Sequence, residues 1–222
     1  MPTDEAYVQL LSLAVHEFRT PANVVSGYLR MLAGEHVSLG EPERRLVDGA
    51  DRSCQNLLSL IADLSDIQKL DAGLLPMTHA RVEIFPLLQA IVNGLDTGRD
   101  DVQLELRGAL EGAALLGDSA RLGRAIGDLT RGVVRGLAPG STAVMACQLD
   151  RHQAPVARII LADAEVLEGA DNASPAPFDE MRGGLGLSLP LARRVIERHG
   201  GRVWAPAGQS ESKAAIVSLP VV

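Results

Sequence analysis

The chain has 222 residues, of which 46% are hydrophobic and 22% are charged, and its formal net charge is -7 at pH 7. This length allows one large hydrophobic core or two smaller ones. The acidic balance disfavours a non-specific surface for nucleic acids or anionic membranes. No apolar run reaches the roughly 18 residues of a membrane span, and the acidic start is unlike a signal peptide. We therefore expect a soluble, cytoplasmic protein that binds no nucleic acid and has no membrane segment in this chain.

Residues 1–74 are predicted to form two long helices joined by a turn at "GEHVSLGEPE". Apolar residues of the first helix recur at three- and four-residue steps at Val8, Leu11, Val15, Phe18, Val25, Tyr28, Leu29 and Leu32. The second helix ends near "KLDAG" and has the apolar spacing of a helical bundle at Ala50, Cys54, Leu57, Ile61 and Leu64. Because one hairpin cannot bury both stripes, we expect a homodimer in which two antiparallel hairpins form a four-helix bundle.

Residues 75–222 are predicted to form a second domain that mixes helices and strands. "VEIFPLLQAIVNGL" indicates a short strand or lead-in and then a helix, and "DVQLELRGAL" alternates like a strand. A helix follows in "DSARLGRAIGDLTRGVVRGLAPGS", with Asp118 as its N-cap and "APGS" as its end. "TAVMACQLD" and "VARIILAD" indicate strands, "EGADNASPAP" a polar loop, "GLSLPLARRVIERHGG" a helix, and "RVWAP" and "AAIVSLPVV" closing strands. This order predicts an α+β protein whose second domain is an α/β sandwich with helices on one face of a sheet.

The segment "AVHEFRTPANVV" places unusual chemistry inside the first helix. His16, Arg19 and Thr20 are neighbours at i, i+3 and i+4, and Glu17 flanks the ring. Pro21 removes the partner of the Glu17 carbonyl, so the helix should bend there. A neutral imidazole is nucleophilic near pH 7, and an adjacent carboxylate can orient its tautomer or take a proton. The alternative reading is a surface histidine with incidental charged neighbours and a tolerated proline.

The stretch "LAVHEFRTPANVVSGYLRML" resembles the H-box of sensor histidine kinases, whose pattern is His-Glu-x-Arg-Thr-Pro on the first helix of a dimerising hairpin. The resemblance extends in order over nearly the entire chain. It implies that His16 is the phosphoacceptor and Glu17 its acid/base partner, with Arg19 in the same motif. It also implies that Thr20 aligns water when a response regulator is dephosphorylated. The second domain would then be the ATP-binding sandwich related to the gyrase, chaperone and mismatch-repair ATPases, a GHKL or Bergerat-like fold.

The first nucleotide-binding motif of that family is only partly matched. "DSARL" is in register with the family's Asp-x-x-Arg-Leu, after which two asparagines should follow. Asp128 and Gly132 occupy their positions: Asp128 could still bind a cation, whereas Gly132 has no side chain with which to bind Mg²⁺. Arg135 stands at a lysine or arginine position and could meet a phosphate. A helix with a basic outer face is the simpler interpretation of this segment.

The second motif, Asp-x-Gly-x-Gly, should follow a strand, and Asp163 ends "ARIILAD" at the position that binds the adenine amine in the family. Glu165 and Leu167 replace its glycines, and their side chains would obstruct a close approach of the nucleotide. Asp163 could equally be a solvated aspartate at a strand end. Both interpretations stay open.

The third motif is retained, because "MRGGLGLSLPLARRVIERHGG" closely matches the family's Gly-x-Gly-Leu-Gly-Leu segment and the helix after it. Gly183, Gly184 and Gly186 would place backbone N–H groups and a helix N-terminus near a triphosphate. Phe178 resembles the phenylalanine motif that precedes them. A glycine-rich turn can also serve only helix–sheet packing. The last glycine turn of the family is replaced by "GQSESKAA".

Together these features predict a degenerate histidine kinase that works as a phosphotransfer protein, similar to the histidine phosphotransferases. His16 would carry a phosphoryl group to or from the aspartate of a response-regulator receiver domain, with ATP and Mg²⁺ only possible cofactors. Loss of the Mg²⁺ ligand should be severe for ATP chemistry, since phosphoryl transfer depends on metal-assisted charge stabilisation. Two alternatives remain: an authentic ATP-dependent kinase with divergent motifs, and a non-catalytic interaction module in which His16 is idle.

Overall fold

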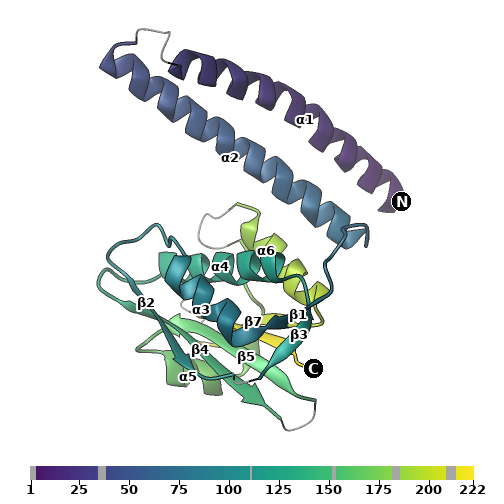
Figure 1. Ribbon diagram of the computed structural model, residues 1–222, viewed down its shortest axis with the longest axis vertical. Helices are drawn as coiled ribbons and strands as arrows, with labels where there is room; N and C mark the ends of the chain where they lie inside the picture. The colour runs from purple at the N-terminus through teal and green to yellow at the C-terminus, as the bar shows by residue number, and fades with distance from the viewer. Residues whose placement is uncertain (1–3, 35–38, 111, 152–153, 182–185, 209–213) are drawn as a thin grey trace. The chain divides into compact units, whose positions relative to one another are not determined.

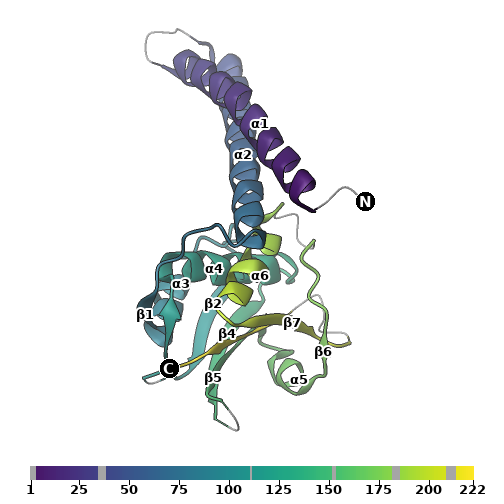
Figure 2. The same ribbon diagram turned by 90° about the vertical axis from the view of Figure 1, so that its right-hand side faces the viewer.

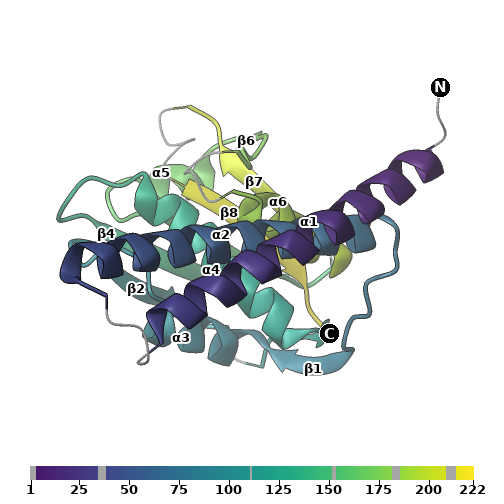
Figure 3. The same ribbon diagram turned by 90° about the horizontal axis from the view of Figure 1, so that it is seen from above.

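The computed structural model describes residues 4–34, 39–110, 112–151, 154–181, 186–208 and 214–222. The chain divides into two compact units, Met1–Leu75 and Pro76–Val222, one residue beyond the boundary suggested by the sequence. The first unit consists of the helices α1 (Asp4–Ala33) and α2 (Glu41–Asp71), which run antiparallel along each other (Figures 1 and 3). None of the described helices is both long enough and apolar enough to cross a bilayer.

Aliphatic side chains, together with a few small residues, form the contact between α1 and α2. The core of the hairpin consists of Val15, Ala22 and Ile61, with Leu58 and Leu64 packed against it. The Cys54 thiol donates a hydrogen bond to the Ala22 carbonyl at 3.2 Å, and the Gln55 amide donates to the Ser26 hydroxyl at 2.9 Å. Alanine and serine at these positions let the two helices approach closely. The predicted apolar spacing marked Val15, Cys54, Ile61 and Leu64 on this face but missed Ala22 and Ser26, because neither of these two is strongly apolar.

Much of the predicted apolar stripe points away from the partner helix. The exposed fractions are 60% for Phe18, 50% for Val25 and 63% for Tyr28, and Leu57 on α2 is 50% exposed. Large apolar side chains rarely gather on a surface that faces only water. One hairpin therefore leaves a second apolar face without a partner, as the sequence led us to expect.

The ends of α2 follow the sequence signals. The helix begins at Glu41 with Pro42 in its first turn, where a missing N–H costs nothing. Its last turn closes through the Ala72 N–H, which donates to the Gln68 carbonyl at 3.0 Å. Gly73 then adopts a φ of 68°, a conformation that glycine reaches without steric cost. The predicted end at "KLDAG" is confirmed.

The second unit is an α/β sandwich with a six-stranded sheet, in the order β2-β4-β5-β8-β7-β6, and a separate β1-β3 pair. Its elements are β1 (Ala80–Glu83), α3 (Ile84–Gly94), β2 (Gln103–Gly108), β3 (Ala114–Gly117), α4 (Ser119–Arg135), β4 (Thr142–Asp150), β5 (Val156–Asp163), α5 (Leu167–Asn172), β6 (Pro175–Ala176), α6 (Ser188–Arg198), β7 (Arg202–Pro206) and β8 (Ala214–Pro220). The β2–β4 pair is parallel, and the other neighbouring strands are antiparallel. This architecture confirms the predicted α+β fold class.

Helices α3, α4 and α6 cover one face of the sheet (Figure 2). Helix α4 shows why: Leu122, Ile126, Leu129 and Val133 follow at helical spacing, and all four are fully buried or nearly so. Burying an aliphatic side chain of this size contributes about 1.5–3 kcal/mol. This face of the sheet therefore holds the main core of the unit.

The predicted polar loop at "EGADNASPAP" is wrong for most of its length. Residues Leu167–Asn172 form the short helix α5, and Pro175–Ala176 pair with β7. Ala170 is fully buried against Ile160, Ala162 and Ile216, so α5 covers part of the sheet face opposite to α4 (Figure 2). The helix has only 6 residues, too few for its period to show among glycine, asparagine and serine. The expectation of helices on only one face is corrected accordingly.

Candidate functional site

His16 projects from the middle of α1 into solvent. Its side chain is 77% exposed and that of Glu17 is 69% exposed. The Nδ1 atom of His16 lies 3.5 Å from Oε1 of Glu17. A carboxylate beside Nδ1 favours the tautomer with the proton on that nitrogen, which leaves the lone pair of Nε2 free to attack an electrophile. The ring is therefore accessible and oriented by its neighbour, as the sequence interpretation requires.

The backbone around His16 is a continuous helix, even though Pro21 lies inside it. Proline deprives the Glu17 carbonyl of its usual intrahelical donor. One turn after His16, the Thr20 hydroxyl donates to the His16 carbonyl at 3.4 Å. That weak hydrogen bond places Thr20 on the same side of the helix as the imidazole. The bend that the sequence predicts at Pro21 stays a prediction.

Arg19 and Thr20 complete an exposed polar group around the ring. Both side chains are exposed on α1, like His16 and Glu17. The structure thus brings the four predicted residues together on one exposed stretch of a single helix. The arrangement offers a nucleophile, a carboxylate, a hydroxyl and a cation to an incoming partner.

In the second unit, the "DSARL" segment is a helix cap. The Asp118 carboxylate accepts hydrogen bonds from the backbone N–H groups of Arg121 at 3.0 Å and Thr78 at 3.2 Å. The Asp118 N–H in turn donates to Nε2 of His199 at 2.9 Å. Burial opposes ionisation of Asp118, but these backbone hydrogen bonds and the charge of Arg121 outweigh it, so the pKa of this carboxyl is lowered. The predicted N-cap is confirmed.

Two arginines form ion pairs with the carboxylate of Asp128. Nη1 of Arg131 donates to its Oδ1 at 2.6 Å, and Nε of Arg124 lies 3.7 Å from its Oδ2. Their charges neutralise the carboxylate that a cation would need. The spacing of i, i+3 and i, i+4 on a helix could have shown these pairs from sequence. Gly132 is buried beside them and offers no ligand.

Asp163 ends β5 in a tight turn rather than in a glycine loop. Its side chain is buried, and Oδ1 accepts the backbone N–H of Glu165 at 3.1 Å. Where the family has its next glycine, Leu167 begins α5 and packs against the sheet. A phosphate or ribose could not approach this backbone as closely as a glycine loop allows.

The remaining predicted nucleotide residues lie partly outside the described residues. Gly183 and Gly184 fall there, whereas Gly186 has a φ of 60° in the turn before α6. Arg135 is exposed on the last turn of α4. The contact between Asp118 and His199 sets the start of α4 against the end of α6, so these helices run antiparallel. Gly186 and Arg135 therefore lie toward the same end of the unit.

Asp163 belongs to that end too. The loop after Arg135 leads into Thr142, whose carbonyl accepts the N–H of Ala164, the residue after Asp163. The fold thus brings Gly186, Arg135 and Asp163, three of the residues predicted for nucleotide binding, toward one end of the unit. Among the described residues, no group of three or more His, Cys, Asp or Glu side chains could hold a metal ion. The side chains that are present do not fit an ATP–Mg²⁺ complex.

Comparison with known proteins agrees with this geometry. Residues 6–73 match the model of the His Kinase A (phospho-acceptor) domain, and His16 lies within them. The chain thus contains a His Kinase A (phospho-acceptor) domain and has sensor histidine kinases among its homologues. It is 25% identical to the sensor protein GacS of Pseudomonas syringae pv. syringae over 95% of this chain and 24% of that protein. The signal transduction histidine-protein kinase BarA of Escherichia coli K12 is 26% identical over 88% of this chain and 22% of its own length. The chain thus spans about a quarter of the length of these curated relatives.

Solved structures show the same fold. Full-length ShkA in complex with AMPPNP aligns with a TM-score of 0.74 at 21% identity, over 96% of this chain and 46% of ShkA. The histidine kinase ThkA, solved with the response regulator protein TrrA, aligns with a TM-score of 0.59 at 14% identity, over 96% of this chain and 61% of that one. This histidine kinase homologue therefore combines a helical hairpin with a GHKL-type sandwich.

Proposed function

We propose that this histidine kinase homologue is a two-component phosphotransfer protein, which carries a phosphoryl group on His16 to or from a response-regulator aspartate. The observation that carries the proposal is the exposed His16 ring, with Nδ1 held 3.5 Å from Glu17 on a dimerisation-type hairpin. The solved complex of ThkA with a response regulator gives a precedent for such a partner. The protein acts in the cytoplasm, where both of its cysteines stay as free thiols.

The transfer step follows from the geometry of His16. The lone pair on Nε2 attacks the phosphorus of an aspartyl phosphate, an N–P bond forms, and the P–O bond to the aspartate breaks. The regulator's carboxylate leaves with that electron pair. Glu17 stabilises the positive charge that develops on the ring, because it lies beside the Nδ1 proton. The reverse step returns the phosphoryl group to an aspartate.

The side chains at the positions of the nucleotide motifs favour a relay over a kinase. Asp128 is bound by arginines, Gly132 has no side chain, and α5 begins where the second glycine motif should lie. Charge stabilisation by Mg²⁺ and exact positioning supply most of the catalysis in phosphoryl transfer from ATP. These residues do not fit an ATP–Mg²⁺ complex. Activity therefore depends on an already phosphorylated partner.

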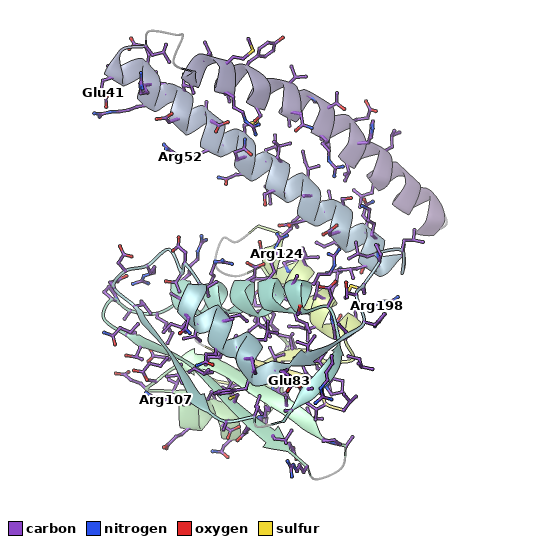
Figure 4. All side chains as sticks on the ribbon, viewed as in Figure 1. Glu41, Arg52, Glu83, Arg107, Arg124 and Arg198 are labelled. Carbon is purple, nitrogen blue, oxygen red and sulfur yellow. The ribbon has the colours of Figure 1, made fainter. Side chains whose placement is uncertain are left out.

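A transfer assay tests the proposal. A panel of receiver domains is phosphorylated with acetyl phosphate, and the unreacted acetyl phosphate is removed. The domains are then mixed with the protein, and acid-labile phosphoryl label on the chain is measured. Label is expected on the native chain and none on His16→Ala, whereas Glu17→Gln transfers more slowly. The matched control Arg52→Gln, an exposed residue of α2 (Figure 4), should transfer normally. Label that persists in His16→Ala contradicts the proposal.

The two alternative functions separate in the same experiment. An authentic kinase would label itself from ATP and Mg²⁺ without a regulator, and calorimetry would detect nucleotide binding at micromolar protein. An interaction module would bind receivers and take no label. A relay takes label from receivers and none from ATP.

A further inference from the structure

The sheet face opposite to α4 has a pocket of about 340 Å³. One of its lining residues, Ala173, directly follows α5, and Figure 2 shows that helix on the sheet face opposite to α4. Its lining residues are Asp150, Val156, Arg158, Ala173, Pro175, Arg202, Trp204 and Ser218. This volume is at the small end of the range of about 300–1,000 Å³ that is usual for small-molecule sites. The pocket belongs to neither the His16 site nor the remnants of the nucleotide motifs.

Strand register places two guanidinium groups on either side of one hydroxyl. Ser218 on β8 pairs with Arg158 on β5 and with Arg202 on β7. Directly paired residues on neighbouring strands point to the same face of a sheet. The three side chains thus form a row of cation, hydroxyl and cation across the pocket. Two arginines and a hydroxyl supply hydrogen-bond donors that suit a carboxylate or phosphate.

The two arginines differ in the hydrogen bonds and ion pairs that each forms within the protein. Arg158 lies 3.3 Å from Oδ1 of Asp171 and donates to the Asp171 carbonyl at 3.0 Å, but its buried Nε has no partner. Arg202 is exposed and, within the described part of the chain, forms no ion pair or hydrogen bond. Asp171 therefore neutralises one cation of the row and leaves the charge of Arg202 for a ligand.

An aromatic wall lies beside this row. The Arg158 guanidinium stacks over the Trp204 ring, 5.7 Å from its centre. Trp204 follows Arg202 by two residues on β7, so both side chains face the pocket. Val156 and Pro175 add apolar surface. Asp150 lines the pocket beside Val156, its cross-strand partner. Because the Asp150 carboxylate would repel an anion, the anionic group of a ligand belongs beside Arg158 and Arg202.

We propose that this pocket binds a small aromatic anion, either a carboxylate or a phosphate monoester. The anionic group sits between Arg202 and Arg158 at the Ser218 hydroxyl, and the ring lies against Trp204 and Pro175. A neutral aromatic compound lacks the negative charge that Arg202 attracts, and a bare inorganic anion lacks the ring that packs against Trp204. The proposal concerns the second unit alone and does not depend on phosphoryl transfer at His16.

Trp204 is the single tryptophan of the chain, so indole fluorescence reports on this pocket directly. Phenyl phosphate and benzoate are titrated into the native protein, with calorimetry as an independent readout. Inorganic phosphate and benzyl alcohol serve as the matched probes without a ring and without a charge. Saturable fluorescence change and heat are expected for phenyl phosphate or benzoate, and at least tenfold weaker binding for the two controls. Whichever of the two anions binds more tightly identifies the preferred headgroup.

Two substitutions decide whether the row of cations is responsible. Arg202→Gln removes an exposed charge without a partner and should weaken phenyl phosphate binding about tenfold or more. Arg107→Gln removes an exposed arginine of the edge strand β2 (Figure 4), which does not line the pocket, and should leave binding unchanged. Equal weakening by both variants overturns the proposal, since general charge would then explain binding. Absence of saturation up to millimolar concentrations of both phenyl phosphate and benzoate, or equal affinity for inorganic phosphate, also overturns it.

Discussion

At the scale of single residues, the chemistry of the chain is concentrated in one exposed helical turn. In the proposed function, His16 supplies the nucleophile, and the Glu17 carboxylate beside Nδ1 selects which ring nitrogen is free. These two residues could be chosen from sequence because they stand with Arg19, Thr20 and Pro21 in a pattern that resembles the H-box. The arginine partners of Asp128 were missed, although Arg124 and Arg131 stand at helical spacing from it.

Thr20 provides a prediction at this scale. Its hydroxyl lies one turn after His16 and has only a weak bond to the His16 carbonyl, so it can also hold a water molecule. Thr20→Ala should slow dephosphorylation of a receiver domain roughly tenfold or more, since a poorly positioned water attacks less often. Transfer onto His16 should stay near the native rate. Thr20→Ser keeps the hydroxyl and should restore most of the lost activity; a normal rate in Thr20→Ala would contradict this role.

At the scale of elements, the cap of α4 links stability to pH. The lowered pKa of Asp118 means that folding favours its ionised form. Its contribution is complete above the unfolded value of about 3.9, and it is lost as pH falls through the lower folded value. Asp118→Ala should cost about 1 kcal/mol near neutral pH through loss of the cap.

The measurement uses urea unfolding followed by Trp204 fluorescence, which reports on the second unit. The free energy of unfolding of the native chain should fall as pH drops below about 4. The same decline should be smaller in Asp118→Asn, which keeps a capping side chain but cannot ionise. Identical pH profiles for the two chains would show that Asp118 is not the group responsible.

Elements also show where prediction from sequence stops. The long helices and the strands β4, β5 and β8 have clear periods, and they form where expected. Helix α5 and strand β3 have 6 and 4 residues, too few for a period to stand out. Sheet order brought Arg158, Ser218 and Arg202 together from three strands, and no local pattern could reveal that row.

At the scale of the whole molecule, the exposed face of the hairpin implies a second copy. Its large apolar residues with half or more of their side chains exposed are Leu13, Phe18, Val24, Val25, Tyr28, Met31, Leu46 and Leu57. An exposed apolar face of this extent marks an interaction surface. A four-helix bundle formed by two hairpins would cover it and would leave polar His16 at the surface.

The dimer is tested by Val25→Glu combined with Tyr28→Glu, which adds two charges one turn apart on that face. Both residues are already exposed in the hairpin, so the fold should persist while the dimer separates. Light scattering after size-exclusion chromatography at micromolar protein should give the mass of a dimer for the native chain and of a monomer for the variant. Arg52→Glu, a charge change at an exposed polar position, should stay dimeric. A monomeric native chain would contradict the bundle.

The central claim is that His16 carries the phosphoryl group on the nitrogen that Glu17 leaves free. The direct measurement is phosphorus NMR of the protein after transfer from a charged receiver domain, combined with mass spectrometry to locate the modified residue. The account predicts a single phosphohistidine at position 16, substituted on Nε2. A phosphoryl group on another residue, on Nδ1 of His16, or on no residue at all would contradict it.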